Sequence, residues 1–185
     1  MSLTDSQKAE LLSLARASIQ EGLKSGRPLR IDLRQYDPAI TLKRASFVTL
    51  ERGGQLRGCI GMLEAVRPLV EDITENAFAA AFRDPRFPPL SEAEYADLDV
   101  HISILSPAEA IDFVSESDLI AQLQPGIDGL ILQEGYRRGT FLPSVWEQLP
   151  DPRQFLRHLK QKAGLPTDYW SETLKIFRYR TEMFS

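Results

Sequence analysis

The hexapeptide Leu56-Arg57-Gly58-Cys59-Ile60-Gly61 brings together the residue types of this sequence that best suit chemistry. Cys59 is the one cysteine of the chain, and Arg57 precedes it by two positions. In a strand these two side chains face the same way, roughly 7 Å apart along the backbone. A neighbouring guanidinium lowers the pKa of a thiol from about 8.5 and raises its thiolate fraction. Gly58 and Gly61 indicate a bulge, or the close approach of a ligand or another backbone.

The same cysteine also fits a packing role, because free cysteines are among the most frequently buried residues. A cysteine nucleophile normally needs a base, and the sequence has two histidines. His158 lies at the margin of an apolar helix face and is the candidate base, whereas His101 lies on the polar face of a predicted strand. Sequence leaves open whether either one reaches Cys59. We expect no metal site and no cofactor, since no Cys-x-x-Cys or His-x-x-x-His pair occurs.

A second constellation follows at residues 83–89, Arg-Asp-Pro-Arg-Phe-Pro-Pro. Arg83 and Arg86, stiffened by prolines, could clamp a carboxylate or phosphate through bidentate hydrogen bonds. In the alternative interpretation, Arg83 caps the last carbonyls of a helix while Asp84 pairs with an arginine. A third segment, residues 141–149, carries aromatic and aliphatic side chains that we expect in a core.

Periodicity predicts the elements that position these residues. Apolar residues at helical spacing predict helices over about residues 4–25, 68–82 and 151–163. Glycine-containing turns predict hairpins over residues 46–61 and 129–142, and alternation predicts strands over 98–105 and 174–184. The fold class is therefore α+β, with largely antiparallel sheets packed with helices. The order hairpin, helix, strand occurs twice, which indicates an internal duplication. Residues 1–185 are interpreted as a single domain, with two closely packed subdomains as the alternative.

Composition limits the classes of function. A net charge of −4 argues against broad electrostatic binding to nucleic acid or to an anionic membrane. One cysteine excludes an internal disulfide and fits a reducing compartment. No stretch approaches the ~20 apolar residues of a transmembrane helix, and no signal peptide is visible. We therefore expect a cytoplasmic protein that uses neither nucleic acid nor membrane as a partner.

Taken together, several segments make the sequence resemble the AMMECR domain family, named after a human Alport-syndrome chromosomal region. They are Leu-Arg-Gly-Cys-Ile-Gly at 56–61, Ala-Phe-Arg-Asp-Pro-Arg-Phe-Pro-Pro-Leu at 81–90, Ile-Ser-Ile-Leu-Ser-Pro at 102–107, Pro-Gly-Ile-Asp-Gly-Leu at 125–130, Gly-Thr-Phe-Leu-Pro-Ser-Val-Trp-Glu-Gln at 139–148 and Phe-Leu-Arg-His-Leu-Lys-Gln-Lys-Ala-Gly-Leu at 155–165. The resemblance implies an α+β fold with an internal repeat and a functional segment around Cys59. It carries no settled activity. Bacterial and archaeal relatives are often encoded or fused with Memo-type and radical-SAM proteins, which implies a shared modification pathway and these proteins as partners.

Two hypotheses follow. In the first, the protein is an enzyme acting on a small or anionic substrate, with Cys59 as nucleophile or sulfur carrier, Arg57 as its activator or oxyanion partner and His158 as base. In the second, it is a noncatalytic binding or adaptor module that uses the same groove for a small molecule or a protein. The candidate substrate- or partner-binding residues, shared by both hypotheses, are Gly58, Gly61, Arg83, Asp84, Arg86, Glu147 and Lys162.

Overall fold

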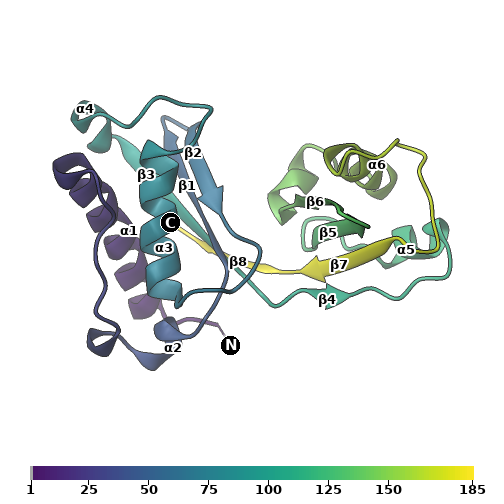
Figure 1. The fold of residues 1–185 in the computed structure, drawn as a ribbon, viewed down its shortest axis with the longest axis horizontal. Helices are drawn as coiled ribbons and strands as arrows, with labels where there is room; N and C mark the ends of the chain where they lie inside the picture. The colour runs from purple at the N-terminus through teal and green to yellow at the C-terminus, as the bar shows by residue number, and fades with distance from the viewer. Residues whose placement is uncertain (1) are drawn as a thin grey trace. The chain divides into compact units, whose positions relative to one another are not determined.

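The computed structural model describes residues 2–185 and divides them into two compact units. The first unit comprises residues 2–105 and 182–185, and the second comprises residues 106–181. Figure 1 shows the elements in chain order. The two units are described separately below.

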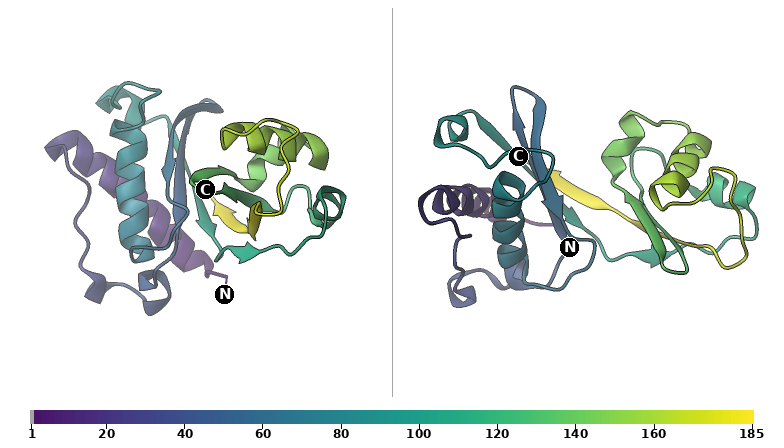
Figure 2. Two further views of the ribbon diagram at one scale, coloured as in Figure 1. Left: turned by 45° about the vertical axis from the view of Figure 1, so that its right-hand side comes forward. Right: turned by 45° about the horizontal axis from the view of Figure 1, so that its top comes forward.

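The first unit is a four-stranded antiparallel sheet with helices on one face (Figures 1 and 2). Its strands lie in the order β2-β1-β3-β8, so the strand that carries the hexapeptide is at an edge. The long helices α1 and α3 pack against each other and cover the sheet. The elements are α1 (Asp5–Ser25), a 3₁₀ turn (Leu33–Gln35), α2 (Pro38–Thr41), β1 (Ser46–Arg52), β2 (Gln55–Gly61), α3 (Leu69–Phe82), α4 (Glu92–Tyr95), β3 (Leu98–Leu105) and β8 (Thr181–Phe184).

Local sequence explains why α1 forms where it does. Thr4 and Gln7 make the expected capping box, with the Thr4 hydroxyl accepting from the Gln7 amide and the Gln7 side chain accepting from the Thr4 amide. The helix ends at Gly26, whose φ of 69° is in the left-handed region that favours glycine. The core between helices and sheet consists mainly of apolar side chains, and each fully buried Val, Leu or Ile stabilises the fold by about 1.5–3 kcal/mol. It includes Leu11, Ile19, Val48, Leu50, Ile73, Ala77 and Ile102.

One buried carboxylate ties α3 to the start of β1. Asp72 is 1% exposed and accepts hydrogen bonds from the Ser46 amide at 3.0 Å, the Ser46 hydroxyl at 2.6 Å and Asn76 at 2.9 Å. Its second oxygen accepts from Arg67. A buried charge is tolerated when it is paired and hydrogen-bonded in this way, so Asp72 fixes the position of α3 over the sheet.

The second unit has its own sheet, in the order β4-β7-β5-β6, and its own core. Trp146 stacks on Phe155 with ring centres 3.7 Å apart and donates to the Asp128 carbonyl at 2.7 Å, as expected for core packing by residues 141–149. The elements are β4 (Glu109–Ala110), α5 (Glu116–Gln122), β5 (Gly129–Glu134), β6 (Arg137–Phe141), a 3₁₀ turn (Pro143–Glu147), α6 (Pro152–Lys162) and β7 (Lys175–Tyr179).

The α+β class with antiparallel sheets is confirmed. In both units a hairpin is followed by a helix and then by a strand that pairs with the first strand of the hairpin, giving β2-β1-β3 and β6-β5-β7. An origin by duplication stays a prediction. The single strand expected over residues 174–184 is wrong, because β7 pairs in the second sheet and β8 pairs in the first. Within residues 2–185, no helix is both long enough and apolar enough to cross a membrane.

Candidate functional site

The hexapeptide lies on β2, and its pairing with β1 contains an irregularity at Arg57. Thr49 faces Cys59 and Leu50 faces Gly58, but the next residue of β1, Glu51, faces Leu56. Arg57 is therefore an extra residue on β2, which is the arrangement of a β-bulge. The expected simple alternation across Arg57 and Cys59 is thus wrong, whereas the bulge that the glycines indicated is present. The two side chains contact different neighbours.

Arg57 is buried and ties the edge strand to the loop and short helix that follow α3. Its Nε donates to Glu94 Oε1 at 2.9 Å, and its Nη2 donates to Glu94 Oε2 at 3.2 Å and to the Pro88 carbonyl at 2.9 Å. The guanidinium also lies 5.7 Å from the centre of the Phe87 ring. Because Glu94 offsets the charge of Arg57, this arginine is committed to the ion pair rather than to the thiol.

The Glu94 carboxylate gives this connection a dependence on pH. The hydrogen bond from Arg57, followed by those from Ser91, lowers the pKa of Glu94 from 4.5 to about 2. A folded-state pKa below the unfolded value stabilises the protein above the unfolded value, and this contribution is lost as pH falls towards the folded value.

We therefore expect Glu94→Gln to lower the free energy of unfolding at pH 7, with the difference from wild type shrinking between pH 4.5 and about 2. Urea unfolding at several pH values measures this. Glu92→Gln, on the exposed side of α4, is the matched control and is expected to change little. A difference that stays constant down to pH 2 would contradict the assignment.

Cys59 is half-buried, and both of its backbone polar groups point away from β1. Its amide donates to Asp84 Oδ2 at 2.9 Å, and its carbonyl accepts from Arg86 Nη2 at 3.4 Å. In an antiparallel pair, residues with outward-pointing backbone groups have the closest side chains. Accordingly, the Cys59 sulfur lies 3.1 Å from the Thr49 hydroxyl. The Asp84–Arg86 pair thus covers the open edge of the sheet at Cys59.

Asp84 is the centre of the second constellation. It is 4% exposed and accepts from the Arg86 amide at 3.1 Å, from Arg86 Nε at 3.0 Å and from Arg86 Nη2 at 2.7 Å. The Arg86 guanidinium and the Cys59 amide hold the pKa of Asp84 well below its usual range. Asp84 therefore pairs with an arginine, as one interpretation predicted. Arg83 is exposed instead, with its guanidinium 4.9 Å from the Phe78 ring centre, so the two arginines do not form one clamp.

The two glycines of the hexapeptide are sites of close approach. A Cβ at Gly58 would lie 2.1 Å from the carbonyl oxygen of Ala80 on α3. A Cβ at Gly61 would lie 2.3 Å from the Phe47 ring and 2.4 Å from the Ser46 carbonyl oxygen. Close approach of another backbone, one of the sequence-based expectations, is thus confirmed at Gly58.

The first unit places His101 in line with the cysteine. Thr49 of β1 faces Cys59 on one side and His101 of β3 on the other, so the three residues form one row across the sheet. Two strand spacings separate the ends of this row, roughly 10 Å at the backbone. His101 Nε2 lies 3.5 Å from Glu51 Oε2.

The remaining candidates belong to the second unit. His158 lies on α6, and its Nδ1 is 2.8 Å from the Gln154 carbonyl of the same helix. Glu147 ends a 3₁₀ turn and is exposed, and the Lys162 ammonium lies 5.1 Å from the centre of the Phe141 ring. The site residues expected from sequence are therefore divided between the two units.

A pocket of about 490 Å³ adjoins the start of the hexapeptide, at the tip of the β1–β2 hairpin. Its lining residues are Arg52, Gly53, Gln55, Leu56, Arg57 and Asp97. Arg57 Nη1 and Arg52 Nε are buried and have no hydrogen-bond partner within residues 2–185. Sequence reasoning missed Arg52 and Asp97, although an arginine at a hairpin tip beside the motif was a usable signal.

Within the described part of the chain, no group of three or more His, Cys, Asp or Glu side chains is arranged to hold a metal ion. The basic side chains at the hairpin suit a carboxylate or a phosphate instead. What the arrangement can do chemically is therefore to bind an anion at the hairpin tip, on a frame fixed by the Arg57–Glu94 and Asp84–Arg86 pairs.

Fold and site together define an α+β protein of two antiparallel sheets. Its first sheet has an edge strand that contains Gly58 and Gly61 and is held by the Arg57–Glu94 and Asp84–Arg86 ion pairs. The AMMECR1 family model matches residues 12–184, and the chain belongs to this family. It is 39% identical over 176 residues to a protein of Methanothermobacter thermautotrophicus, covering 94% of this chain and 91% of that protein. A Thermotoga maritima protein is 37% identical over 168 residues, with coverage of 90% and 91%. The crystal structure of an uncharacterized protein from Pyrococcus horikoshii superposes with a TM-score of 0.89 at 36% identity, covering 98% of this chain and 92% of that one.

Proposed function

We propose that the hairpin tip of the first unit is a recognition site for a small anionic ligand, and that the hexapeptide serves binding rather than covalent catalysis. The observation that carries this proposal is the pocket beside Leu56 and Arg57, whose volume of about 490 Å³ is within the usual range for small-molecule sites. The binding-module hypothesis therefore takes precedence over the enzyme hypothesis.

The arginine donors explain why the ligand is an anion. A guanidinium has five N–H groups, and the Arg57 contacts to Glu94 and Pro88 leave Nη1 without a partner. A buried donor with no acceptor costs about 1–3 kcal/mol, which a ligand oxygen that reaches it would recover. Arg52 adds a second guanidinium, whose Nη1 and Nη2 pair with Glu94 and Asp97 while its Nε has no partner within residues 2–185. Asp97 pairs with Arg52 at 3.8 Å, and its remaining acceptor capacity favours ligands that also have a hydroxyl or amine group.

Cys59 supports binding less directly than Arg57 does. Its sulfur contacts Thr49, and its backbone groups are used by Asp84 and Arg86. It does not belong to the lining of the hairpin pocket. The row that Cys59 forms with Thr49 and His101 is the feature that would favour thiol chemistry, and the experiment below separates the two functions.

We expect citrate or inorganic phosphate to shift the amide NMR signals of Gln55 and Leu56, and Arg52→Ala to weaken this binding about tenfold, the value of one charge-assisted hydrogen bond. Arg52 is 39% exposed at its side chain but its Nη1 also pairs with Glu94 Oε1 at 3.2 Å, so thermal unfolding verifies that the variant folds. Cys59→Ser is the matched control and is expected to change affinity less than about twofold. An affinity that is unchanged in Arg52→Ala, or binding that is abolished by Cys59→Ser, would contradict the proposal.

A further inference from the structure

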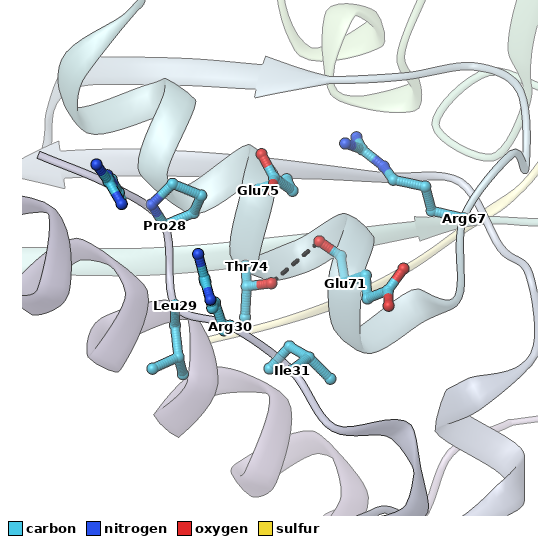
Figure 3. A pocket seen from close by; sticks show the side chains of 9 residues that line it. Pro28, Leu29, Arg30, Ile31, Arg67, Glu71, Thr74 and Glu75 are labelled. Carbon is cyan, nitrogen blue, oxygen red and sulfur yellow. Dashed lines mark hydrogen bonds between the residues drawn. The ribbon is translucent and has the colours of Figure 1, made fainter.

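A second hollow of about 510 Å³ lies on the first unit, between the chain that follows α1 and the N-terminal half of α3 (Figure 3). It shares no residue with the hairpin pocket. Its lining residues are Arg27, Pro28, Leu29, Arg30, Ile31, Arg67, Glu71, Thr74 and Glu75. Five of these nine carry a charge, which is the feature that sets this hollow apart.

The wall that carries Arg27 and Arg30 is held in place by a buried hydroxyl. Ser18 of α1 is fully buried, donates to the Thr74 carbonyl of α3 at 2.7 Å and accepts from the Leu29 amide at 3.1 Å. This one hydroxyl joins two helices and the segment that passes beside them. Arg27 and Arg30 therefore extend from positions on either side of a fixed point, Leu29.

The opposite wall is held by the Asp72 network. Arg67 donates through Nε at 3.2 Å and Nη2 at 3.0 Å to Asp72, whose other oxygen is bound by Ser46 and Asn76. Figure 3 shows Arg30 and Arg67 on opposite sides of the hollow, with Glu71 and Glu75 of α3 between them. Buried hydrogen-bonding groups thus hold the frame of the hollow on both sides.

The charges that line the hollow are not paired with one another. Within residues 2–185, neither Arg27 nor Arg30 makes an ion pair or a side-chain hydrogen bond, and Glu71 and Glu75 make none with them. Glu71 and Glu75 are one helical turn apart, so like charges are neighbours on α3. The two arginines and the two glutamates therefore line the same cavity without contacting each other.

We infer that this hollow binds a small zwitterion. A phosphate or carboxylate of the ligand contacts Arg27 and Arg30, for which planar guanidinium groups are well suited. An amine of the same ligand contacts Glu71 and Glu75 and relieves their mutual repulsion. A ligand with anionic groups at both ends is disfavoured, because the two glutamates would repel its second anion.

Four probes test the inference: O-phosphoethanolamine and β-alanine, which carry both charges, and inorganic phosphate and ethanolamine, which carry one each. The readout is the shift of the Thr74 and Glu75 amide NMR signals during titration. We expect one of the two zwitterions to bind at least about tenfold more tightly than either single-charge probe, an additional ~1.4 kcal/mol. Phosphoethanolamine as the tighter zwitterion identifies a phosphate ligand, and β-alanine identifies a carboxylate ligand.

Three variants assign the binding to the proposed groups. Arg27→Ala/Arg30→Ala is expected to abolish binding of the zwitterion, and Glu71→Gln/Glu75→Gln to reduce its affinity to that of the single-charge anion. Arg34→Ala is the matched control, because Arg34 lies in the same segment but pairs with Asp32 outside the hollow, and it is expected to bind normally. The replaced side chains all reach solvent, and thermal unfolding verifies that the variants fold. Equal affinity for phosphate and both zwitterions, no shift with any probe, or binding that survives the double arginine variant would each overturn the inference.

Discussion

Gly58→Ala is expected to lower the free energy of unfolding by about 3 kcal/mol or more, the upper end of the usual cost of overpacking. The added Cβ would lie 2.1 Å from the Ala80 carbonyl oxygen and 3.0 Å from its carbonyl carbon. Both atoms belong to the backbone of α3, so no side chain can rotate to make room. Either β2 or α3 must move, and α3 is held by the buried Asp72 network.

Urea unfolding of Gly58→Ala against wild type measures the effect, and Gly54→Ala is the matched control. Gly54, in the turn of the same hairpin, has a φ of 76° and no atom within 4 Å of the place that a Cβ would occupy, whereas Gly58 has no positive φ. Gly54→Ala therefore tests backbone strain alone, at about 1–2 kcal/mol, and Gly58→Ala tests steric contact alone. If Gly54→Ala costs more than Gly58→Ala, the hexapeptide does not need its glycine for packing against α3.

The hairpin and α3 could be predicted because their signals are local. Alternation around Gly53-Gly54 indicated both strands, and the spacing of Leu69, Ile73 and Ala77 indicated the helix. Each of these patterns reports which face of one element is apolar. For the hairpin and α3 the structure agrees with the predicted bounds to within a residue or two.

The glycines indicated a bulge as one interpretation, but its position at Arg57 could not be predicted from a local pattern. The bulge exists because Gly58 must face the α3 backbone while the Arg57 guanidinium reaches Glu94, which is 37 residues further along the chain. These are tertiary constraints on the register, and a period-two pattern does not contain them. The hairpin pocket was missed for the same reason, since Asp97 joins Arg52 through the pairing of β1 with β3.

The split of the last strand also depends on distant partners. Residues 174–184 read as one β-rich segment, yet β7 pairs with β5 and β4 while β8 pairs beside β3. The change of sheet falls at Arg180, whose amide and carbonyl both bond to Ser106. Nothing local to Arg180 marks a change of sheet, because its backbone is extended on both sides. The division into two units was therefore invisible in the pattern of that segment.

Asp84→Ala is expected to lower the free energy of unfolding by about 2–3 kcal/mol, somewhat less than for a fully buried ion pair because Arg86 is partly exposed. The substitution removes the acceptor of the Cys59 amide and the partner of a guanidinium that is 54% exposed at its side chain. It also frees the loop that begins at Asp84, leaving the loop attached to β2 through Arg57. The edge of the sheet at Cys59 becomes open to water.

The pH dependence of this loss distinguishes the ion pair from simple packing. The pKa of Asp84 is held well below its ordinary value, chiefly by Arg86, so the stabilisation is present above that ordinary value and declines as pH falls below it. We therefore expect the difference between wild type and Asp84→Ala to be largest near pH 7 and smaller at pH 2, measured by urea unfolding. Asp99 is an exposed carboxylate on β3, so Asp99→Ala is the control and should show little loss of stability at either pH.

Hydrogen exchange adds a local readout, because the Cys59 amide loses its acceptor in Asp84→Ala and should exchange faster. The Gly26 amide at the end of α1 keeps its bond to Gly22 and should exchange as in wild type. An unchanged exchange rate at the Cys59 amide would show that the Asp84 carboxylate does not protect the edge strand. The position of the hexapeptide would then depend on Arg57 and on the close packing at the glycines alone.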